Sequence, residues 1–476
     1  MLVGLYVFSC YKAGRTTHFS KWDDRHQHRA PQIQVRTAQQ EMKKGFYTIM
    51  AAQFFSSLAD NALLIAAIAL LKDLHAPQWM TPLLKLFFVL SYVVLAAFVG
   101  AFADSRPKGN VMFLTNMIKI AGCITMLVGA HPLVAYGIVG FGAAAYSPAK
   151  YGILTELLPP ERLVAANGWI EGTTVGSIIL GTVLGGALIA PHIARYTMFY
   201  ALPFVHSPAE AAMVVIMGIY VIAALFNLGI PDTGARYPVQ QRDPVRLVSD
   251  FADCFTVLWN DKLGQISLAV TTLFWGAGAT LQFIVLKWAE VSLGMNLSQG
   301  AILQAVVAAG VAVGAMVAAS KIPLKRSLSV LPVGIMMGVS IMAMAFYNRN
   351  LFPAGWGLTV GHMHLPAYLI VAYLFLMFVG ALSGFFVVPM NALLQHRGHV
   401  LLSAGHSIAV QNFNENLSVL IMLVLYAVLI WLDAPVELVI ILFGTFVCLM
   451  MWLFMLRHQA NQRVFDSVAL IGEAKH

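Results

Sequence analysis

Charged side chains are scarce in this sequence, and their scarcity excludes an ordinary water-soluble fold. Aspartate, glutamate, lysine and arginine make up 11% of the 476 residues, whereas hydrophobic residues make up 59%. A water-soluble domain carries about 25% charged residues. So few charges cannot cover a surface in water, and the mean hydropathy of +0.77 agrees with this. We therefore predict a polytopic membrane protein.

Several motifs of binding and catalysis are also missing. The four cysteines, Cys10, Cys123, Cys254 and Cys448, are scattered without a C-x-x-C pair, which predicts neither a disulfide framework nor a metal site. No glycine-rich loop followed by lysine and then serine or threonine is present, so an ATP-driven pump is unsupported. We expect no cofactor and no metal ion.

The N-terminal segment 1–41 is polar after its first ten residues and lacks the small-residue cleavage motif of a signal peptide. Met42, Lys43 and Lys44 follow it, directly before the first long apolar run. We interpret residues 1–44 as a cytoplasmic tail, or as a leader that precedes the true start.

Apolar segments long enough to cross a bilayer recur along the rest of the chain. A spanning helix needs about 20 predominantly apolar residues. The longest internal hydrophilic stretch, 231–262, separates six such segments from another six, as in transporters built from two repeats. The predicted spans are 46–71, 83–103, 111–130, 133–155, 164–190, 211–230, 265–288, 300–320, 328–347, 366–390, 403–431 and 434–456.

These segments predict an all-α integral membrane protein of 12 transmembrane helices in two halves. We place the first half at 45–230, a central cytoplasmic loop at 231–264, and the second half at 265–457. Residues 458–476 form a C-terminal cytoplasmic tail in this scheme.

The loops between the spans indicate the orientation. With both termini inside, cationic residues gather on the cytoplasmic side, which is the positive-inside pattern. The formal net charge of +8 is then mostly a matter of topology, and we do not interpret it as a nucleic-acid surface. The cytoplasmic set is Lys43, Lys44, Arg106, Lys108, Arg162, Arg236, Arg242, Arg246, Lys262, Lys321, Lys325, Arg326 and Arg397, against Lys72, Lys85, Arg195, Lys287 and Arg349 outside.

The two halves share a sequence pattern. The fourth span contains AYSPAKYGIL followed by VAANG, and the tenth contains FVVPMNALLQ followed by LSAGH. Pro148 then matches Pro389, and Ala166 matches Ala404. The equivalent positions favour an internal duplication, and we expect the two prolines to break their spans where the halves rock.

The loop after the second span reads GAFADSRPKG. It resembles the G-x-x-x-D-(R/K) signature of the major facilitator superfamily, with Gly100, Asp104, Arg106 and Lys108 at the matching positions. The equivalent loop in the second half, GAMVAASKIPLKR, keeps the glycine and the cations but has no acid. The resemblance implies the facilitator fold, with Asp104 at the positive end of the eleventh helix and a role in conformational gating. The alternative is a loop whose charges only set the topology.

Longer stretches narrow the resemblance. AAQFFSSLADNALL, GAAAYSPAKYGIL, ANGWIEG, LFWGAGATL, GFFVVPMNALLQ and AVQNFNENLSVLIM closely resemble the bacterial lysophospholipid transporters, from about residue 45 to residue 457. The resemblance implies facilitated diffusion of lysophospholipids, chiefly 2-acyl-glycerophosphoethanolamine, across the bacterial inner membrane. It also implies a functional link to an acyltransferase that re-acylates them on the cytoplasmic side.

Asp60 lies near the middle of the first span. At a rise of about 1.5 Å per residue, it is about 20 Å from the cytoplasmic end of its helix. A charge at that depth costs at least about 3 kcal/mol, and the short side chain cannot reach the interface. The functional interpretation is a substrate site that includes Asp60 and its neighbour Asn61, and the alternative is a protonated or internally paired structural carboxyl group.

The eleventh span carries a polar stripe of Gln411, Asn412, Glu415 and Asn416. A helix face of this kind avoids lipid, so it should meet another helix or a wet cavity. Packing between helices through amide groups is the alternative for its asparagine and glutamine residues.

Cationic residues within the spans lie nearer the cytoplasm, at Lys119 and Lys150, and Glu171 with Asn167 lies at a similar depth. Each lysine could extend to the interface. An ion-pair cluster of Lys119, Lys150 and Glu171 is the structural alternative.

Together these groups suggest a site for a phosphoethanolamine head group. The hypothesis is that Asp60 and Glu415 receive the ammonium or balance the charge, while Lys119 and Lys150 attract the phosphate. The family resemblance implies a further cation just after FWGAG in the seventh span, but this chain has Gln282 there, and Lys287 lies near the outer interface.

Two other functions remain as alternatives. His18 and Asp23 have the H-x-x-x-x-D spacing of glycerolipid acyltransferases, but they lie in a short polar tail rather than in a domain. A proton-coupled exporter of amphipathic drugs would share the fold and the buried carboxylates, and transport without a proton gradient would distinguish it.

Overall fold

The computed structural model describes residues 29–77, 80–190, 205–238, 243–295, 297–353, 356–360 and 363–471. The chain divides into two compact units, Met1–Lys44 and Gly45–His476, and all the predicted spans lie in the second unit. His18 and Asp23 lie outside the described residues.

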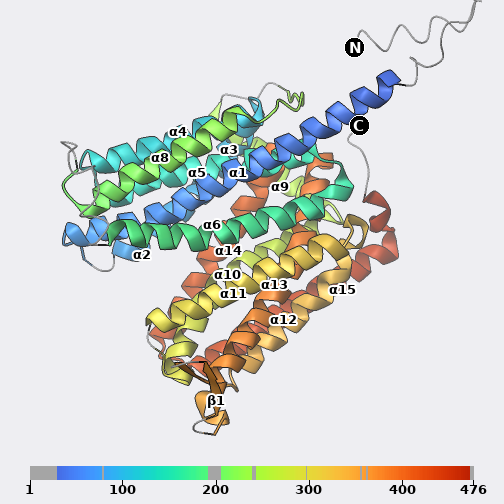
Figure 1. The fold of residues 1–476 in the computed structure, drawn as a ribbon. Helices are drawn as coiled ribbons and strands as arrows, with labels where there is room; N and C mark the ends of the chain where they lie inside the picture. The colour runs from blue at the N-terminus through green and yellow to red at the C-terminus, as the bar shows by residue number, and fades with distance from the viewer. Residues whose placement is uncertain are drawn as a thin grey trace, which may run out of the picture. The chain divides into compact units, whose positions relative to one another are not determined.

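The first half of this unit consists of helices, of which α1 belongs to this unit from Gly45 onwards (Figure 1). They are α1 (Arg29–Asp73), α2 (Met80–Val94), α3 (Ala96–Asp104), α4 (Lys108–Leu127), α5 (Pro132–Leu157), α6 (Leu163–Ile189) and α8 (Pro208–Leu228), with a 3-10 turn η1 (Pro160–Arg162) before α6.

The second half is also helical. It contains α10 (Gly264–Leu293), α11 (Leu297–Lys321), α12 (Leu331–Met344), α13 (Ala367–Leu401), α14 (Ala404–Trp431) and α15 (Val436–Val464). The 3-10 turns η3 (Leu324–Val330), η4 (Arg349–Leu351) and η5 (Ser467–Leu470) and a hairpin of β1 (Gly357–Val360) and β2 (Met363–Pro366) complete it. In the hairpin the strands are antiparallel, and Gly357 is opposite Pro366.

A helix occupies each predicted span. Ten helices in the described part of the chain are long and apolar enough to cross a membrane, and the pair α2 and α3, bent by 65° next to Leu95, brings the number to eleven. The twelfth position is α5, 26 residues long and rich in glycine, alanine and tyrosine. Because α5 is covered by α2, α4 and α14, it needs less lipid-facing apolar surface.

The structure differs from the sequence predictions at two prolines and in two spans. Pro148 and Pro389 do not break their spans, because α5 and α13 each continue through the proline as one helix. A membrane helix tolerates an internal proline when neighbouring groups satisfy the freed backbone carbonyl. The tenth span is also longer than predicted, since α13 extends to Leu401. The predicted second span is the pair α2 and α3 rather than one straight helix.

Small residues bring the helices close together. A Cβ on Gly185 would lie 2.7 Å from the carbonyl oxygen of Ala62 in α1, and one on Gly314 would collide with the Ala381 backbone in α13. Such close approach is how helices gain packing energy in lipid, where burial of apolar surface contributes little. The glycine pairs Gly181/Gly185 and Gly310/Gly314 therefore set two helix contacts, α6 with α1 and α11 with α13.

The predicted central loop contains a helix, α9 (Pro244–Asn260). Asp243 caps it by accepting a hydrogen bond from the Val245 backbone N–H at 3.0 Å, and Pro244 at the first helical position has no N–H to satisfy. Its apolar residues include Phe251, which meets Phe413 of α14 with ring centroids 5.5 Å apart.

Because α9 packs against α3 in the first half and against α10 and α14 in the second, it lies on both halves (Figure 1). We call this end of the unit, with the last residue of α3 (Asp104) and the first of α14 (Ala404), the α9 end. The apolar core follows the same division, since one buried cluster joins residues of α1, α5 and α6 to α10–α15, and another lies within the first half.

Candidate functional site

Asp60 on α1 is one half of a buried ion pair. Its carboxylate accepts a hydrogen bond from the Lys119 ammonium of α4 at 2.8 Å and another from the Tyr220 hydroxyl of α8 at 2.7 Å. Lys119 is 1% exposed and also donates to the Ser56 hydroxyl at 3.0 Å. Lys119 therefore does not extend to the interface, as its position in the sequence had allowed, but balances the charge of Asp60.

Aromatic rings complete the surroundings of Lys119. Its ammonium lies 5.0 Å from the centre of the Tyr146 ring and 5.6 Å from that of Tyr220. A ring face attracts a desolvated cation, by about 2 kcal/mol in favourable cases. The pair is thus held firmly by the first half, although 20% of the Asp60 side chain is still exposed.

Lys150 and Glu171, unlike Asp60 and Lys119, are not joined in an ion pair. Glu171 on α6 is buried, and its Oε1 has no hydrogen-bond partner among the described residues. Lys150 on α5 is partly exposed, and the part of the chain that the structure describes places no carboxylate within ion-pair distance of it.

The buried carboxylate of the second half is Glu415 on α14. Its Oε1 accepts a hydrogen bond from the Gln411 amide at 2.7 Å, and Gln411 also donates to Asn391 of α13 at 3.2 Å. The Thr271 hydroxyl of α10 donates to the Leu268 carbonyl of its own helix at 3.2 Å. Glu415 therefore lies among neutral hydrogen-bonding groups rather than beside a bonded cation.

Amide groups join the two halves. Asn412 and Ser147 of α5 exchange hydrogen bonds of 3.0 and 3.3 Å, and Asn167 and Gln395 of α13 exchange bonds of 2.8 and 2.9 Å. Packing by amides, which the sequence left as an alternative, thus describes Asn412 and Asn167. Asn61 and Asn416 each donate to a carbonyl of their own helix, at Ser57 and Asn412.

Asp104 lies where the sequence places it, at the start of α14. Its Oδ1 accepts from the Gly405 backbone N–H at 3.0 Å, and its Oδ2 is 3.0 Å from His406 Nδ1. Lys108 and Ser403 also donate to this carboxylate, whose side chain is fully buried. The carboxylate thus satisfies a free N–H group at the positive end of a helix.

The other residues of the GAFADSRPKG motif have separate positions. Arg106 is exposed, whereas Lys108 is buried. A Cβ on Gly100 would lie 3.0 Å from the His406 Cα, and one on Gly405 would lie 2.6 Å from Asp104 Oδ1. Glycine at both positions is what lets α3 and α14 approach, so the halves are in close contact at the α9 end.

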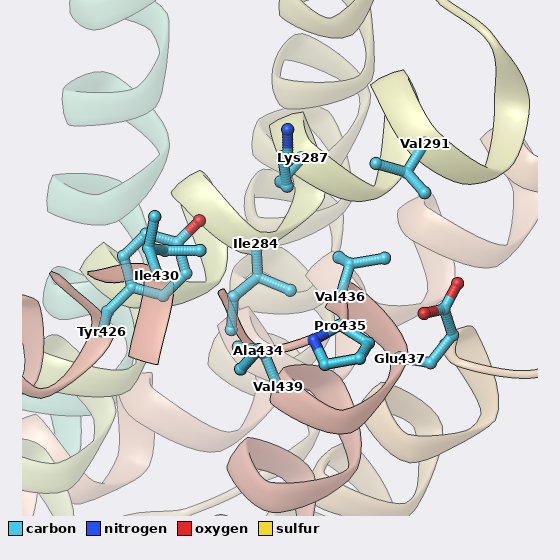
Figure 2. Close-up of a pocket in the computed structure, with 10 residues that line it drawn as sticks. All are labelled: Ile284, Lys287, Val291, Tyr426, Ile430, Ala434, Pro435, Val436, Glu437 and Val439. Carbon is cyan, nitrogen blue, oxygen red and sulfur yellow. The ribbon is translucent and has the colours of Figure 1, made fainter. Parts of the chain in front are cut away.

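Gln282 lies apart from these groups, exposed on α10, where its backbone carbonyl accepts a hydrogen bond from Gln304. Farther along α10, Lys287 borders a pocket of about 310 Å³ between α10, α14 and α15 (Figure 2). Its wall is mainly apolar, with side chains such as Ile284 and Val439, and its charged residues are Lys287 and Glu437. None of the predicted site residues lines this pocket, so it is separate from the buried charges.

Sequence reasoning missed several partners of the predicted residues. Tyr220 and Ser56 bind the charges directly, but they belong to other spans than the residues they contact. A signal existed for Tyr220, because a tyrosine inside an apolar helix needs a partner for its hydroxyl group. Ser56 gave no such signal, because a serine hydroxyl can also bond to its own helix backbone.

Comparison with known proteins adds two sequence findings. The family model described as Major Facilitator Superfamily matches residues 49–423. The lysophospholipid transporter LplT of Yersinia enterocolitica is 41% identical over 396 residues, which cover 83% of this chain and 89% of that protein. LplT of Yersinia pestis matches to the same extent.

Solved structures share the fold. The Escherichia coli fucose:proton symporter FucP superposes with a TM-score of 0.64 at 12% identity, over 87% of this chain and 98% of that one. A bacterial homologue of the iron transporter ferroportin has a TM-score of 0.63 at 12% identity, over 88% and 99%. At these identities the likeness concerns the fold alone.

Proposed function

The chain belongs to the major facilitator superfamily and, within it, to the lysophospholipid transporter family, and we propose that it carries lysophospholipids across the membrane by alternating access. The observation that carries this proposal is two charged groups on the membrane helices: Glu171 on α6, whose buried Oε1 has no hydrogen-bond partner among the described residues, and Lys150 on α5, which has no described carboxylate within ion-pair distance. Buried charges without partners cost several kcal/mol, about 3–5 when one partner of a pair is missing. A zwitterionic ligand would supply the missing charges.

The contacts suggest which residues receive the head group. Lys150 is partly exposed and has no bonded carboxylate among the described residues, so it is the cation best suited to a phosphate. Glu171 and Glu415 are the carboxylates best suited to an ammonium, because their hydrogen bonds come from neutral groups or are missing. Asp60 and Lys119 balance each other and shape the site from the first half.

The remaining proposed residues have supporting roles. Asn61, Asn167, Gln411, Asn412 and Asn416 orient the charged groups or hold the halves together around them. Gln282, which is exposed on α10, would contact the substrate outside the charge cluster. Gly100, Asp104, Arg106 and Lys108 act on the conformational change rather than on the substrate.

We also propose the direction and location of this transport. The excess of lysine and arginine on one set of loops supports placing the α9 end and both termini in the cytoplasm, in the inner membrane of a bacterium. The substrate, chiefly 2-acyl-glycerophosphoethanolamine, would reach the cytoplasmic leaflet by facilitated diffusion. An acyltransferase there would then re-acylate it, so this protein itself performs no chemical step.

Transport by the purified protein in lipid vesicles tests the proposal. We expect labelled lysophosphatidylethanolamine to cross the bilayer with and without a proton gradient, and we expect Glu171→Gln and Lys150→Gln to lower the initial rate at least about tenfold, as loss of one charged hydrogen bond does. Asp73→Asn is the control, because Asp73 is exposed at the end of α1.

Two outcomes would contradict it. Transport that stops when an ionophore collapses the gradient would favour a proton-coupled exporter of amphipathic compounds with the same fold. Acyl transfer by the purified protein to a labelled lysophospholipid would show an enzyme instead.

A further inference from the structure

The connection between the two halves begins with an ordered turn. Asp232 accepts a hydrogen bond from the Gly234 backbone N–H at 3.0 Å, and Gly234 has φ +76°, a conformation that glycine adopts without strain. Arg236 forms two hydrogen bonds with the Asp232 carboxylate, of 2.9 and 2.7 Å. This turn directs the next residue, Tyr237, back towards the protein.

Tyr237 contacts a buried carboxylate at the end of α5. Its hydroxyl donates to Glu156 Oε1 at 2.8 Å, and Thr233 of the same turn donates to Glu156 Oε2 at 2.7 Å. The Glu156 side chain is 3% exposed. Both carboxylate oxygens are therefore occupied by the connecting segment, which explains how an acidic group is accommodated there.

The start of α14 lies beside this part of α5. A Cβ on Gly152 of α5 would lie 3.2 Å from the Cβ of Ala404, the first residue of α14, and 3.4 Å from the Lys108 Cε. The first half therefore meets the second half close to Lys108.

Tyr237 lies next to the network around Asp104. The Lys108 ammonium is 4.9 Å from the centre of the Tyr237 ring and 3.6 Å from Glu156 Oε1, and it also donates to Asp104. Contacts therefore run from the connecting segment through Glu156 and Lys108 to Asp104 and the start of α14. Burial, and then the nearby Glu156 charge, raise the pKa of Tyr237 above its ordinary value, so the hydroxyl group stays protonated and can donate.

We propose that Tyr237 is a positioning residue of the transport cycle, which stabilises the conformation closed at the α9 end by holding Glu156 and Lys108 beside Asp104, whose carboxylate binds the start of α14. The role rests on alternating access as the proposed mode of transport. When the halves separate at this end, the bond from the Gly405 backbone N–H to Asp104 breaks, whereas the bonds from Thr233 and Tyr237 to Glu156 do not cross between the halves and persist.

Distances between spin labels on the two halves test this role. The turns η1 and η3 contact each other across the halves, and Glu161 and Lys325 are exposed on them. Labels on Glu161→Cys and Lys325→Cys, in a background without the native cysteines, therefore report a short distance when this end is closed. In lipid nanodiscs we expect Tyr237→Phe to raise the ratio of long to short distances about three- to tenfold, the effect of losing one buried hydrogen bond.

Tyr347→Phe is the matched control. It removes a hydroxyl that donates to the Tyr368 carbonyl at 2.6 Å, in the second half and away from the α9 end. We expect its distance distribution to equal that of the parent protein. A distribution for Tyr237→Phe that equals the parent, or a similar shift in Tyr347→Phe, would overturn the role of Tyr237.

A second variant extends the test to the partner. Glu156→Gln removes the charge to which Tyr237 donates, and we expect it to shift the distances in the same direction as Tyr237→Phe; an unchanged distribution would count against the proposal. Because these distances are measured without substrate, a shift together with absent lysophospholipid transport would refute the proposed substrate and still support Tyr237.

Discussion

At the scale of the residue, Lys119 and Lys150 show that the groups around a side chain determine its role. Both are lysines within membrane helices, and both could in principle extend to the interface. Lys119 is enclosed by Asp60, Ser56 and two tyrosine rings, whereas Lys150 remains partly exposed. The first is therefore suited to hold the protein together and the second to meet a ligand.

The ion pair gives a prediction about stability. Asp60→Ala leaves the Lys119 ammonium buried without its carboxylate, and we expect a loss of about 3 kcal/mol in the free energy of unfolding, the lower end for a broken buried pair because Asp60 is partly exposed. Thermal unfolding of the purified protein in detergent measures it.

The double variant Asp60→Ala/Lys119→Met separates stability from function. Replacing both charges by apolar groups is often neutral for stability, so we expect unfolding to return close to that of the parent. Transport should stay low if the charges also shape the substrate site. A double variant as unstable as Asp60→Ala would mean that the ion pair is not the cause.

At the scale of the element, α6 offers a comparison within one helix. Gly185 faces α1, where a Cβ would lie 2.7 Å from the Ala62 carbonyl oxygen and 2.9 Å from the Ile65 Cβ. Gly186, the next residue, has no atom within 4 Å of the same position among the described residues. The two glycines therefore differ in packing but not in helical context.

We expect Gly185→Ala to lower the free energy of unfolding by about 1–3 kcal/mol, because the helices must move apart to admit the methyl group. Gly186→Ala should be neutral or stabilising by up to about 1 kcal/mol, since alanine favours a helix. Unfolding temperatures in detergent compare the two directly. Equal losses in both variants would show that the α1–α6 contact does not depend on close approach.

Sequence patterns predicted where the helices lie better than they predicted how the helices bend and where they end. Apolar runs placed a helix at every predicted span, because lipid admits few other backbone arrangements. The bend near Leu95 and the continuation of α13 to Leu401 depend on which helices lie alongside, and no local pattern announces them. Helix α9 was missed because its apolar residues, such as Leu247, Phe251 and Phe255, are separated by polar ones, so they form an amphipathic face and not the long apolar run that marks a span.

At the scale of the whole molecule, the halves are joined by one buried apolar cluster and by polar groups near the α9 end. Asp104 gathers donors from its own half and from α14, and the amide pairs of Asn167 with Gln395 and of Ser147 with Asn412 join the halves nearby. Hydrogen bonds can be broken and remade in water at low net cost. This suits an interface that must open in every cycle.

Asp104→Asn tests the interface as a whole. The amide keeps the shape but loses the charge that Lys108 and the start of α14 stabilise, so the balance between conformations should change. We expect the maximal rate of lysophospholipid transport to change by about tenfold or more, with half-saturation within about twofold, since hydrogen bonds to charged groups contribute about 1.5–3 kcal/mol.

Asp433→Asn is the control for that variant. Asp433 is exposed and has φ +52°, a conformation that asparagine also accepts. An unchanged rate in Asp104→Asn, or an equal change in Asp433→Asn, would argue against gating by Asp104.

The sequence by itself determined the lipid environment, the two halves, the family and the unusual charged residues, because each depends on composition or on spacing along one helix. Only the tertiary structure decided that Asp60 pairs with Lys119, that Asn412 bonds to Ser147, and that Tyr237 binds Glu156 beside Lys108. These partners come from separate helices. Which of them meet depends on how the helices pack, and helical periodicity carries no information about a neighbour in another span.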